Sequence, residues 1–186
     1  MGVKGDSKAG AKSRRKGANF ERETAVLFRK WWGDGVQRTP MSGAYGPEWE
    51  LAGDLMFVDP PKSQPHRRWP FYVELRNRES WRLEQLYAGE GPVFAWLEET
   101  KGAAMKMDLL PMLIIHRAFV PALVCIRQQE IDGMRYAAEG AICTTVAEWR
   151  IMALDGFLAT AAPEQVWRLN KVGRSVRAPD QPIDFT

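Results

Sequence analysis

The sequence has few of the residues that build disulfide scaffolds and zinc sites. Its 186 residues include two cysteines and two histidines. Cys125 and Cys143 lie in separate segments without a CxxC spacing, so we interpret them as small hydrophobic residues in a reducing, cytoplasmic compartment. His66 falls in a loop and His116 at a strand end, and their separation is not a ligand spacing. A disulfide framework or a zinc site is therefore not expected.

Long hydrophobic runs and two common catalytic loops are also absent. No apolar run reaches about 18 residues, and no apolar signal core follows the basic N-terminus, so we expect neither a membrane span nor a secretory peptide. Neither a Walker-type phosphate loop nor a G-x-S-x-G nucleophile elbow is present. The remaining composition, 45% hydrophobic and 26% charged with a formal net charge of +3, is that of one globular domain with a substantial core.

The positive charge is concentrated at the N-terminus. Residues 1–16 contain a single acid, Asp6, against six basic residues: Lys4, Lys8, Lys12, Arg14, Arg15 and Lys16. Glycine, alanine and serine supply most of the rest, so the segment is expected to be flexible and disordered in isolation. Such an arm suits contact with nucleic-acid phosphates, and the alternative is a solvated tail without function.

The apolar spacing of the remaining chain predicts an α/β domain. Helical spacing runs from about Ala18 to Trp32, with Asn19 as the N-cap and a buried face made of Phe20, Thr24, Leu27, Phe28 and Trp31. Strands are predicted at 36–39, 53–58, 71–76, 111–116, 121–126 and 149–153, and further helices at 81–87, 92–101, 155–161 and 163–169. The short connection at 117–120 indicates a hairpin. This order predicts a single compact domain with a central mixed β-sheet flanked by helices.

Two of the predicted strands carry acids. Asp54 opens the 53–58 strand, while Glu74 lies inside the 71–76 strand with Arg76 two residues later, on the same face. A carboxylate on a buried strand is costly unless a partner compensates it. A Mg²⁺ or Mn²⁺ ion shared by Asp54 and Glu74 would do so, because hard cations prefer oxygen ligands. Alternatively, Glu74 and Arg76 form a same-face salt bridge with no catalytic role.

The acid strand followed by Glu74-Leu75-Arg76 resembles the PD-(D/E)XK nuclease superfamily. The opening is similar to archaeal and phage Holliday-junction resolvases of that superfamily, through Arg15-Lys16-Gly17 and then Phe20-Glu21-Arg22. The Ser42-Gly43 loop lies where that family places a serine near the active site. Residues 73–86 are similar to phage-encoded members, and the resemblance covers about residues 14–127.

The resemblance implies a restriction-endonuclease-like core and a Mg²⁺- or Mn²⁺-dependent endodeoxyribonuclease. It implies that Asp54, Glu74 and Glu21 hold the metal and that Ser42 and Arg76 complete the catalytic set. It implies a four-way (Holliday) junction as the substrate, in DNA recombination, and a homodimer, because paired symmetric nicks need two active sites. Residues expected to contact DNA are Arg14, Arg15, Lys16, Arg22, Arg67, Arg68 and Arg78. A phage-encoded protein of this kind would work in the host cytoplasm.

One residue departs from the family pattern, since Arg76 stands where a lysine is usual. Arginine cannot shuttle protons at ordinary pH, although it holds phosphate well. Three alternatives therefore stay open: another PD-(D/E)XK endonuclease of restriction or repair type, a catalytically weakened DNA-binding protein, and a plain α/β domain whose acids are structural. The expected division is a basic arm over 1–16, a nuclease core over 17–127, an extension packed on it over 128–170, and a tail over 171–186.

Overall fold

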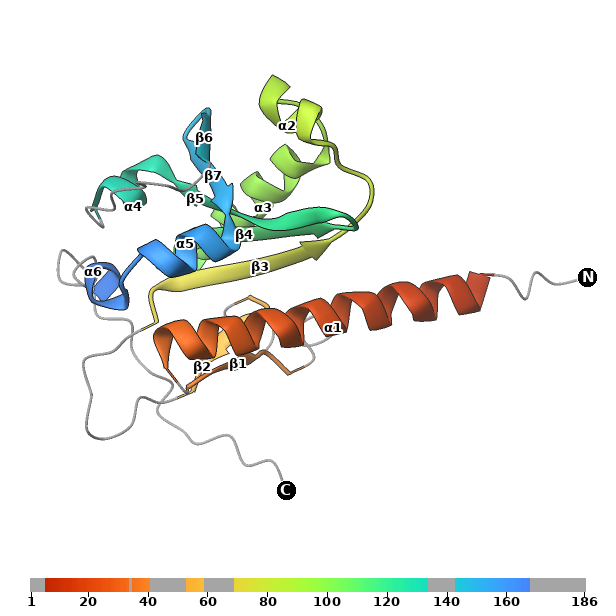
Figure 1. The fold of residues 1–186 in the computed structure, drawn as a ribbon, viewed down its shortest axis with the longest axis horizontal. Coiled ribbons are helices and arrows are strands. Elements are labelled where there is room, and N and C mark those ends of the chain that lie inside the picture. The colour runs from red at the N-terminus through yellow and green to blue at the C-terminus, as the bar shows by residue number, and fades with distance from the viewer. Residues whose placement is uncertain (1–5, 34, 41–52, 59–68, 134–142, 168–186) are drawn as a thin grey trace, which may run out of the picture.

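The computed structural model describes residues 6–33, 35–40, 53–58, 69–133 and 143–167. Its helices are α1 (Asp6–Trp32), α2 (Leu83–Ala88), α3 (Pro92–Lys106), α4 (Gln128–Gly133), α5 (Leu154–Thr160) and α6 (Pro163–Trp167). Its strands are β1 (Val36–Arg38), β2 (Leu55–Phe57), β3 (Phe71–Asn77), β4 (Leu110–Arg117), β5 (Val120–Arg127), β6 (Cys143–Val146) and β7 (Trp149–Ala153). Figure 1 shows α1 running beside β3, with α2 and α3 across the sheet from it.

The main sheet has five strands in the order β3-β4-β5-β7-β6. β3 and β4 are parallel, whereas β4–β5, β5–β7 and β6–β7 are antiparallel. β1 and β2 form a separate antiparallel pair. The prediction of an α/β fold with a central mixed sheet is confirmed, and so is the β4–β5 hairpin.

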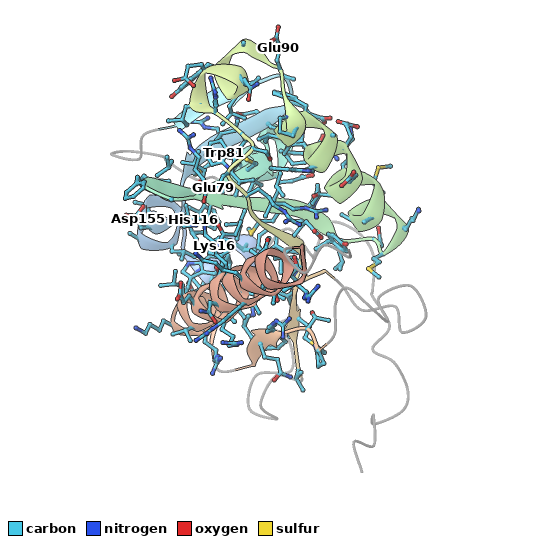
Figure 2. The ribbon with its side chains drawn as sticks, turned by 90° about the vertical axis from the view of Figure 1, so that its right-hand side faces the viewer. Lys16, Glu79, Trp81, Glu90, His116 and Asp155 are labelled. Carbon is cyan, nitrogen blue, oxygen red and sulfur yellow. The ribbon has the colours of Figure 1, made fainter. Side chains whose placement is uncertain are left out.

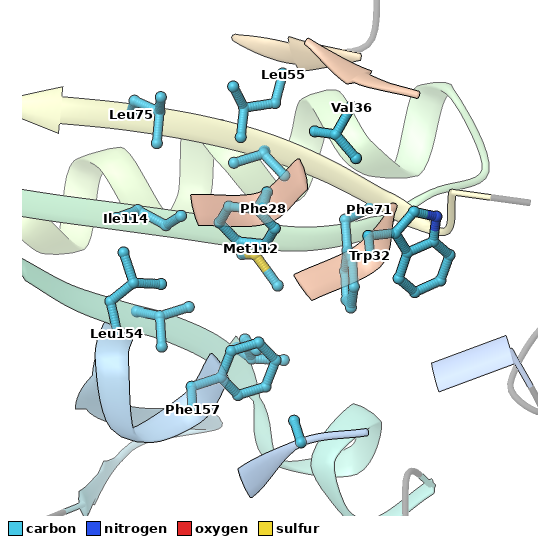
Figure 3. Close-up of a cluster of buried hydrophobic side chains, with 14 of the residues drawn as sticks. Phe28, Trp32, Val36, Leu55, Phe71, Leu75, Met112, Ile114, Leu154 and Phe157 are labelled. Carbon is cyan, nitrogen blue, oxygen red and sulfur yellow. The ribbon is translucent and has the colours of Figure 1, made fainter. Parts of the chain in front are cut away.

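Two apolar layers, one on each face of this sheet, form the core. On the α1 side, Phe28 and Trp32 pack with Phe71, Met112 and Ile114, as Figure 3 shows. On the other side, residues from α2, from α3 and from the segment before α2 pack with Leu113 and Ile115, which alternate along β4 with Met112 and Ile114. These packing residues are Trp81, Leu86, Val93 and Leu97. Because a central strand is buried on both faces, its sequence is a continuous apolar run, and this run is what predicted β4.

The first helix differs most from the prediction. α1 begins at Asp6, not near Ala18, so Asn19 lies inside the helix and is not its N-cap. Residues 6–16 are therefore helical in the structure. Their lysine, arginine and alanine side chains favour helix, and extending a docked helix costs far less than starting one. The predicted buried face is also partly wrong, because Leu27 is 43% exposed while Trp32 is buried.

Smaller differences concern element ends. α2 starts at Leu83 instead of Trp81, and α3 continues to Lys106. β7 forms over the predicted residues, while α4 and β6 were not predicted. Trp69 packs edge-on against Phe28, Trp32 and Phe71, so it belongs to the core. The predicted tail over 171–186 lies outside the described residues.

Candidate active site

β3 presents a polar face at the edge of the main sheet. Phe71, Val73 and Leu75 are buried in the core on the α1 side. The alternating residues Tyr72, Glu74 and Arg76 are partly exposed on the other face. Because β3 is the first strand of the sheet, one of its edges is open to residues outside the sheet.

Asp54 occupies that open edge. Its backbone N–H donates to the carbonyl oxygen of Val73 at 2.7 Å, and the N–H of Leu75 donates to its carboxylate Oδ2 at 2.8 Å. Its own carbonyl oxygen accepts the N–H of Thr39 at 2.9 Å. Asp54 thus bonds to the residues on either side of Glu74. This explains how an acid 20 positions earlier in the chain comes to lie beside Glu74.

Gly53 makes this close approach possible. Its φ is +76°, and it forms an isolated parallel bridge with Val73. A Cβ atom at this position would lie 2.3 Å from the carbonyl oxygen of Val73. Because backbone cannot move aside as a flexible side chain can, only glycine fits here without displacing Asp54.

We expect Gly53→Ala to destabilise the protein by about 2 kcal/mol or more, from the left-handed backbone and the steric clash. It should also abolish the metal-dependent DNA cleavage expected from the sequence, because Asp54 loses its place beside β3. Chemical denaturation and a cleavage assay measure the two effects. Gly102→Ala in α3 is the matched control, because nothing lies within 4 Å of a Cβ at that position. Equal stability of Gly53→Ala and the native protein would contradict this account of the strand edge.

The electrostatic environment of Glu74 is unfavourable for its negative charge. Burial and then the neighbouring Asp54 carboxylate raise the pKa of Glu74 from 4.5 to about 7. Arg76 opposes this rise, with its Nη2 atom 3.1 Å from Oε1 of Glu74. The predicted same-face ion pair is therefore present. Arg76 offsets only part of the rise that burial and Asp54 cause, because the pKa of Glu74 stays above its usual value.

Metal binding by Asp54 and Glu74 fits these observations. Their carboxylate oxygens are the donors that Mg²⁺ and Mn²⁺ prefer, and a divalent cation would supply the positive charge that Arg76 alone does not. Glu21, however, is ion-paired with Arg38, and its effect on Glu74 is a weaker repulsion. Within the described ranges, no group of three or more His, Cys, Asp or Glu residues is placed to hold a metal ion. The three-acid set expected from the sequence is thus assembled only as the pair Asp54 and Glu74.

The structure adds three residues that the sequence reasoning missed. Tyr72 hydrogen-bonds Glu74, and burial followed by the charge of Glu74 raises the pKa of Tyr72 to about 12. Glu99 of α3 lies 3.3 Å from Nη2 of Arg76. Arg38 holds Glu21. The two-residue period of β3 could have indicated Tyr72, whereas nothing in the local sequence pairs Glu99 or Arg38 with these acids.

The predicted DNA-contacting residues are spread over two regions. Arg14, Arg15 and Arg22 lie along α1, where Arg22 donates to the side chain of Asn19 at 2.9 Å. Lys16 is ion-paired with Glu79, and Arg78 is exposed just after β3. Ser42, His66, Arg67 and Arg68 lie outside the described residues.

A mixed sheet covered by helices, with an acid held against a strand that carries Glu-x-basic, is the arrangement of the PD-(D/E)XK class of nucleases. Residues 12–168 match a family model described as "Phage putative PDDEXK endonuclease". The chain belongs to that family, whose members hydrolyse phosphodiester bonds. No curated protein and no solved structure matches it. A search of the described helices found none with the length and apolar character of a membrane span.

Proposed function

We propose that the protein is a divalent-metal-dependent DNA endonuclease that selects branched DNA and resolves four-way junctions as a homodimer. The observation that carries the metal-dependent chemistry is the placement of Asp54 against β3, where hydrogen bonds to the backbone of Val73 and Leu75 hold it beside Glu74. Burial, and then the Asp54 carboxylate, raise the pKa of Glu74 despite the adjacent Arg76. The junction preference rests on the likeness of Arg15-Lys16-Gly17 and Phe20-Glu21-Arg22 to resolvases.

Asp54 and Glu74 would hold the Mg²⁺ or Mn²⁺, and Glu21 is a third candidate ligand on α1. When bound, the metal stabilises the charge that develops on the scissile phosphate and on the leaving oxygen. Asp54 is positioned for this role by two hydrogen bonds to the β3 backbone. Tyr72 orients Glu74, and its high pKa of about 12 keeps the phenol protonated and able to donate.

Arg76 would bind the scissile phosphate. Its guanidinium lies between Glu74 and Glu99, whose carboxylates hold it beside the proposed metal site. A guanidinium binds phosphate oxygens through two parallel N–H groups, but it cannot release a proton at ordinary pH. Arg76 therefore contributes charge and orientation, and it does not act as a general base.

The test is cleavage of a labelled four-way junction in Mg²⁺, beside a linear duplex of the same sequence. We expect paired symmetric nicks on the junction, no product in EDTA, and a solution mass that corresponds to two chains. Faster cleavage of the linear duplex would favour a restriction- or repair-type endonuclease on the same metal site. Junction binding without nicks in Mg²⁺ or Mn²⁺ would contradict the enzymatic proposal.

The ion pairs of Arg76 favour one alternative, a DNA-binding protein with a weakened site. Arg76→Lys separates the two hypotheses, since lysine keeps the charge and removes the bidentate geometry. For an active enzyme we expect the rate to stay within about tenfold of the native rate, a change of about 1.4 kcal/mol. Cleavage gained by Arg76→Lys from an inactive native protein would establish the weakened site. Arg82→Lys, at an exposed position just before α2, controls for nonspecific effects of the exchange.

A further inference from the structure

The turn between β4 and β5 holds an aromatic residue in an unusual state. The turn residues Ala118 and Phe119 lie between the paired residues Arg117 and Val120. Phe119 has a φ of +63° and is 105% exposed. Glycine or asparagine is the ordinary residue for such a backbone, and a bulky side chain there is strained. Phe119 gains no burial in return, so both its conformation and its exposure are costly within the protein alone.

The turn is held firmly in place. The backbone N–H of Ala118 donates to both carboxylate oxygens of Glu79 at 3.3 Å, and Glu79 is in turn ion-paired with Lys16 of α1. Just before the turn, His116 stacks on Phe20 with ring centroids 5.1 Å apart and contacts Asn77 at 3.2 Å. Figure 2 shows Lys16, Glu79 and His116 close together. These contacts fix the position of the turn, and therefore the position from which Phe119 extends into solvent.

The turn also lies near the proposed active site and among cations. In the β3–β4 register, Arg76 pairs with Ile115 and Glu74 with Leu113, so the turn at Ala118 follows three and five residues later. At about 3.3 Å per residue, the turn lies roughly 10 Å along the sheet from Arg76 and roughly 17 Å from Glu74, which is about three and about five nucleotides of a DNA strand. Arg78 is exposed just after β3, and Arg15 is exposed on the first half of α1. Lys16 is ion-paired with Glu79, and Arg117 lies over the Trp81 ring and donates to the Trp81 carbonyl oxygen at 3.2 Å.

We propose that Phe119 stacks on an unpaired or splayed base of branched DNA and thereby holds the branch about five nucleotides from the Asp54–Glu74 site. This proposal rests on the proposed DNA endonuclease function. Exposed aromatic rings stack on bases of any sequence, and flanking cations bind the phosphates on either side. A second copy of this chain fits less well, because a two-fold contact at the turn would bring the same cations together.

The test is equilibrium binding in EDTA of the native protein and Phe119→Gly to a labelled four-way junction and to an uninterrupted duplex. We expect Phe119→Gly to lower junction affinity by roughly 5- to 150-fold, the range for one lost stacking contact, and to change duplex affinity by less than about twofold. A 2-aminopurine at the branch should report unstacking with the native protein and not with Phe119→Gly. An equal loss of affinity for the junction and for the duplex, or no loss of affinity for either, would overturn the proposal.

Two controls separate this effect from misfolding and from self-association. Glycine relieves the positive φ, so the melting temperature of Phe119→Gly should equal or exceed that of the native protein. Met105→Ala removes another exposed apolar side chain (67% exposed) in α3, before the start of β4, and should bind both DNAs as the native protein does. A lower solution mass of Phe119→Gly would show that the residue serves a dimer contact and would overturn the proposal.

The outcome is separable from that of the proposed enzymatic function. Cleavage in Mg²⁺ tests the Asp54–Glu74 site, whereas binding in EDTA tests Phe119 alone. A native protein that never nicks DNA, but whose junction affinity depends on Phe119, would support the stacking contact and contradict the nuclease proposal. A protein that cleaves the junction, but whose junction affinity is unchanged in Phe119→Gly, would support the nuclease proposal and contradict the stacking contact.

Discussion

Asp54→Asn should abolish cleavage while leaving the fold and DNA binding intact. The asparagine oxygen can still accept the Leu75 N–H that Asp54 accepts at 2.8 Å, and the backbone bond to Val73 does not depend on the side chain. What is lost is one negative oxygen ligand of the proposed metal. If the metal contributes about 4 kcal/mol to the reaction, its loss lowers the rate by roughly a thousandfold.

The matched control for this change is Asp155→Asn. Asp155 is exposed on α5, and its carboxylate also accepts a backbone N–H, that of Gly156 at 2.8 Å. The same chemical change should therefore leave cleavage unaltered. Single-turnover kinetics on the junction, with melting curves for all proteins, measure both effects. Native-like cleavage by Asp54→Asn would remove Asp54 from the proposed mechanism.

Glu74→Gln should stop cleavage and, without divalent metal, stabilise the protein at neutral and alkaline pH. In the folded protein, burial and then the Asp54 carboxylate raise the pKa of Glu74 from 4.5 to about 7. The folded state therefore holds this proton more tightly than the unfolded state does. As pH rises from 4.5 through 7, ionisation of Glu74 costs stability, and the cost is complete above pH 7.

Glutamine mimics the protonated carboxyl, so the variant should avoid that cost. A gap of about 2.5 pH units corresponds to at most about 3 kcal/mol, and the gain should disappear below pH 4.5. Urea denaturation in EDTA at several pH values measures it. Glu90→Gln, at an exposed position labelled in Figure 2, should show no such pH-dependent gain. A Glu74→Gln protein less stable than the native one at pH 8 would mean that Arg76 compensates Glu74 fully.

Divalent metal should reverse the order of stability. A ligand that binds only the folded state stabilises it in proportion to the logarithm of its concentration above the dissociation constant. Adding Mg²⁺ or Mn²⁺ should therefore raise the melting temperature of the native protein and have little effect on Glu74→Gln or Asp54→Asn. Equal shifts in all three proteins would place metal binding elsewhere.

Local sequence patterns determined much of the fold. The two-residue period of β3 placed Glu74 and Arg76 on one face, and continuous apolar runs marked β4 and β5, because burial selects side chains by face along each strand. The Gly53-Asp54 pair and the Glu74-Leu75-Arg76 triplet identified the candidate acids. The start of α1 was missed, since the gain from docking its second half outweighs the weak local signal at Asn19.

The sequence by itself thus determined which residues of a strand share a face and which residues are candidates for the chemistry. Only the tertiary structure decided which of them meet. The bonds from Asp54 to the backbone of Val73 and Leu75 bring it beside Glu74, α3 places Glu99 against Arg76, and Arg38 engages Glu21. Periodicity is a property of neighbouring residues and appears in any short window. Contacts between distant segments depend on how whole elements pack, which no short window contains.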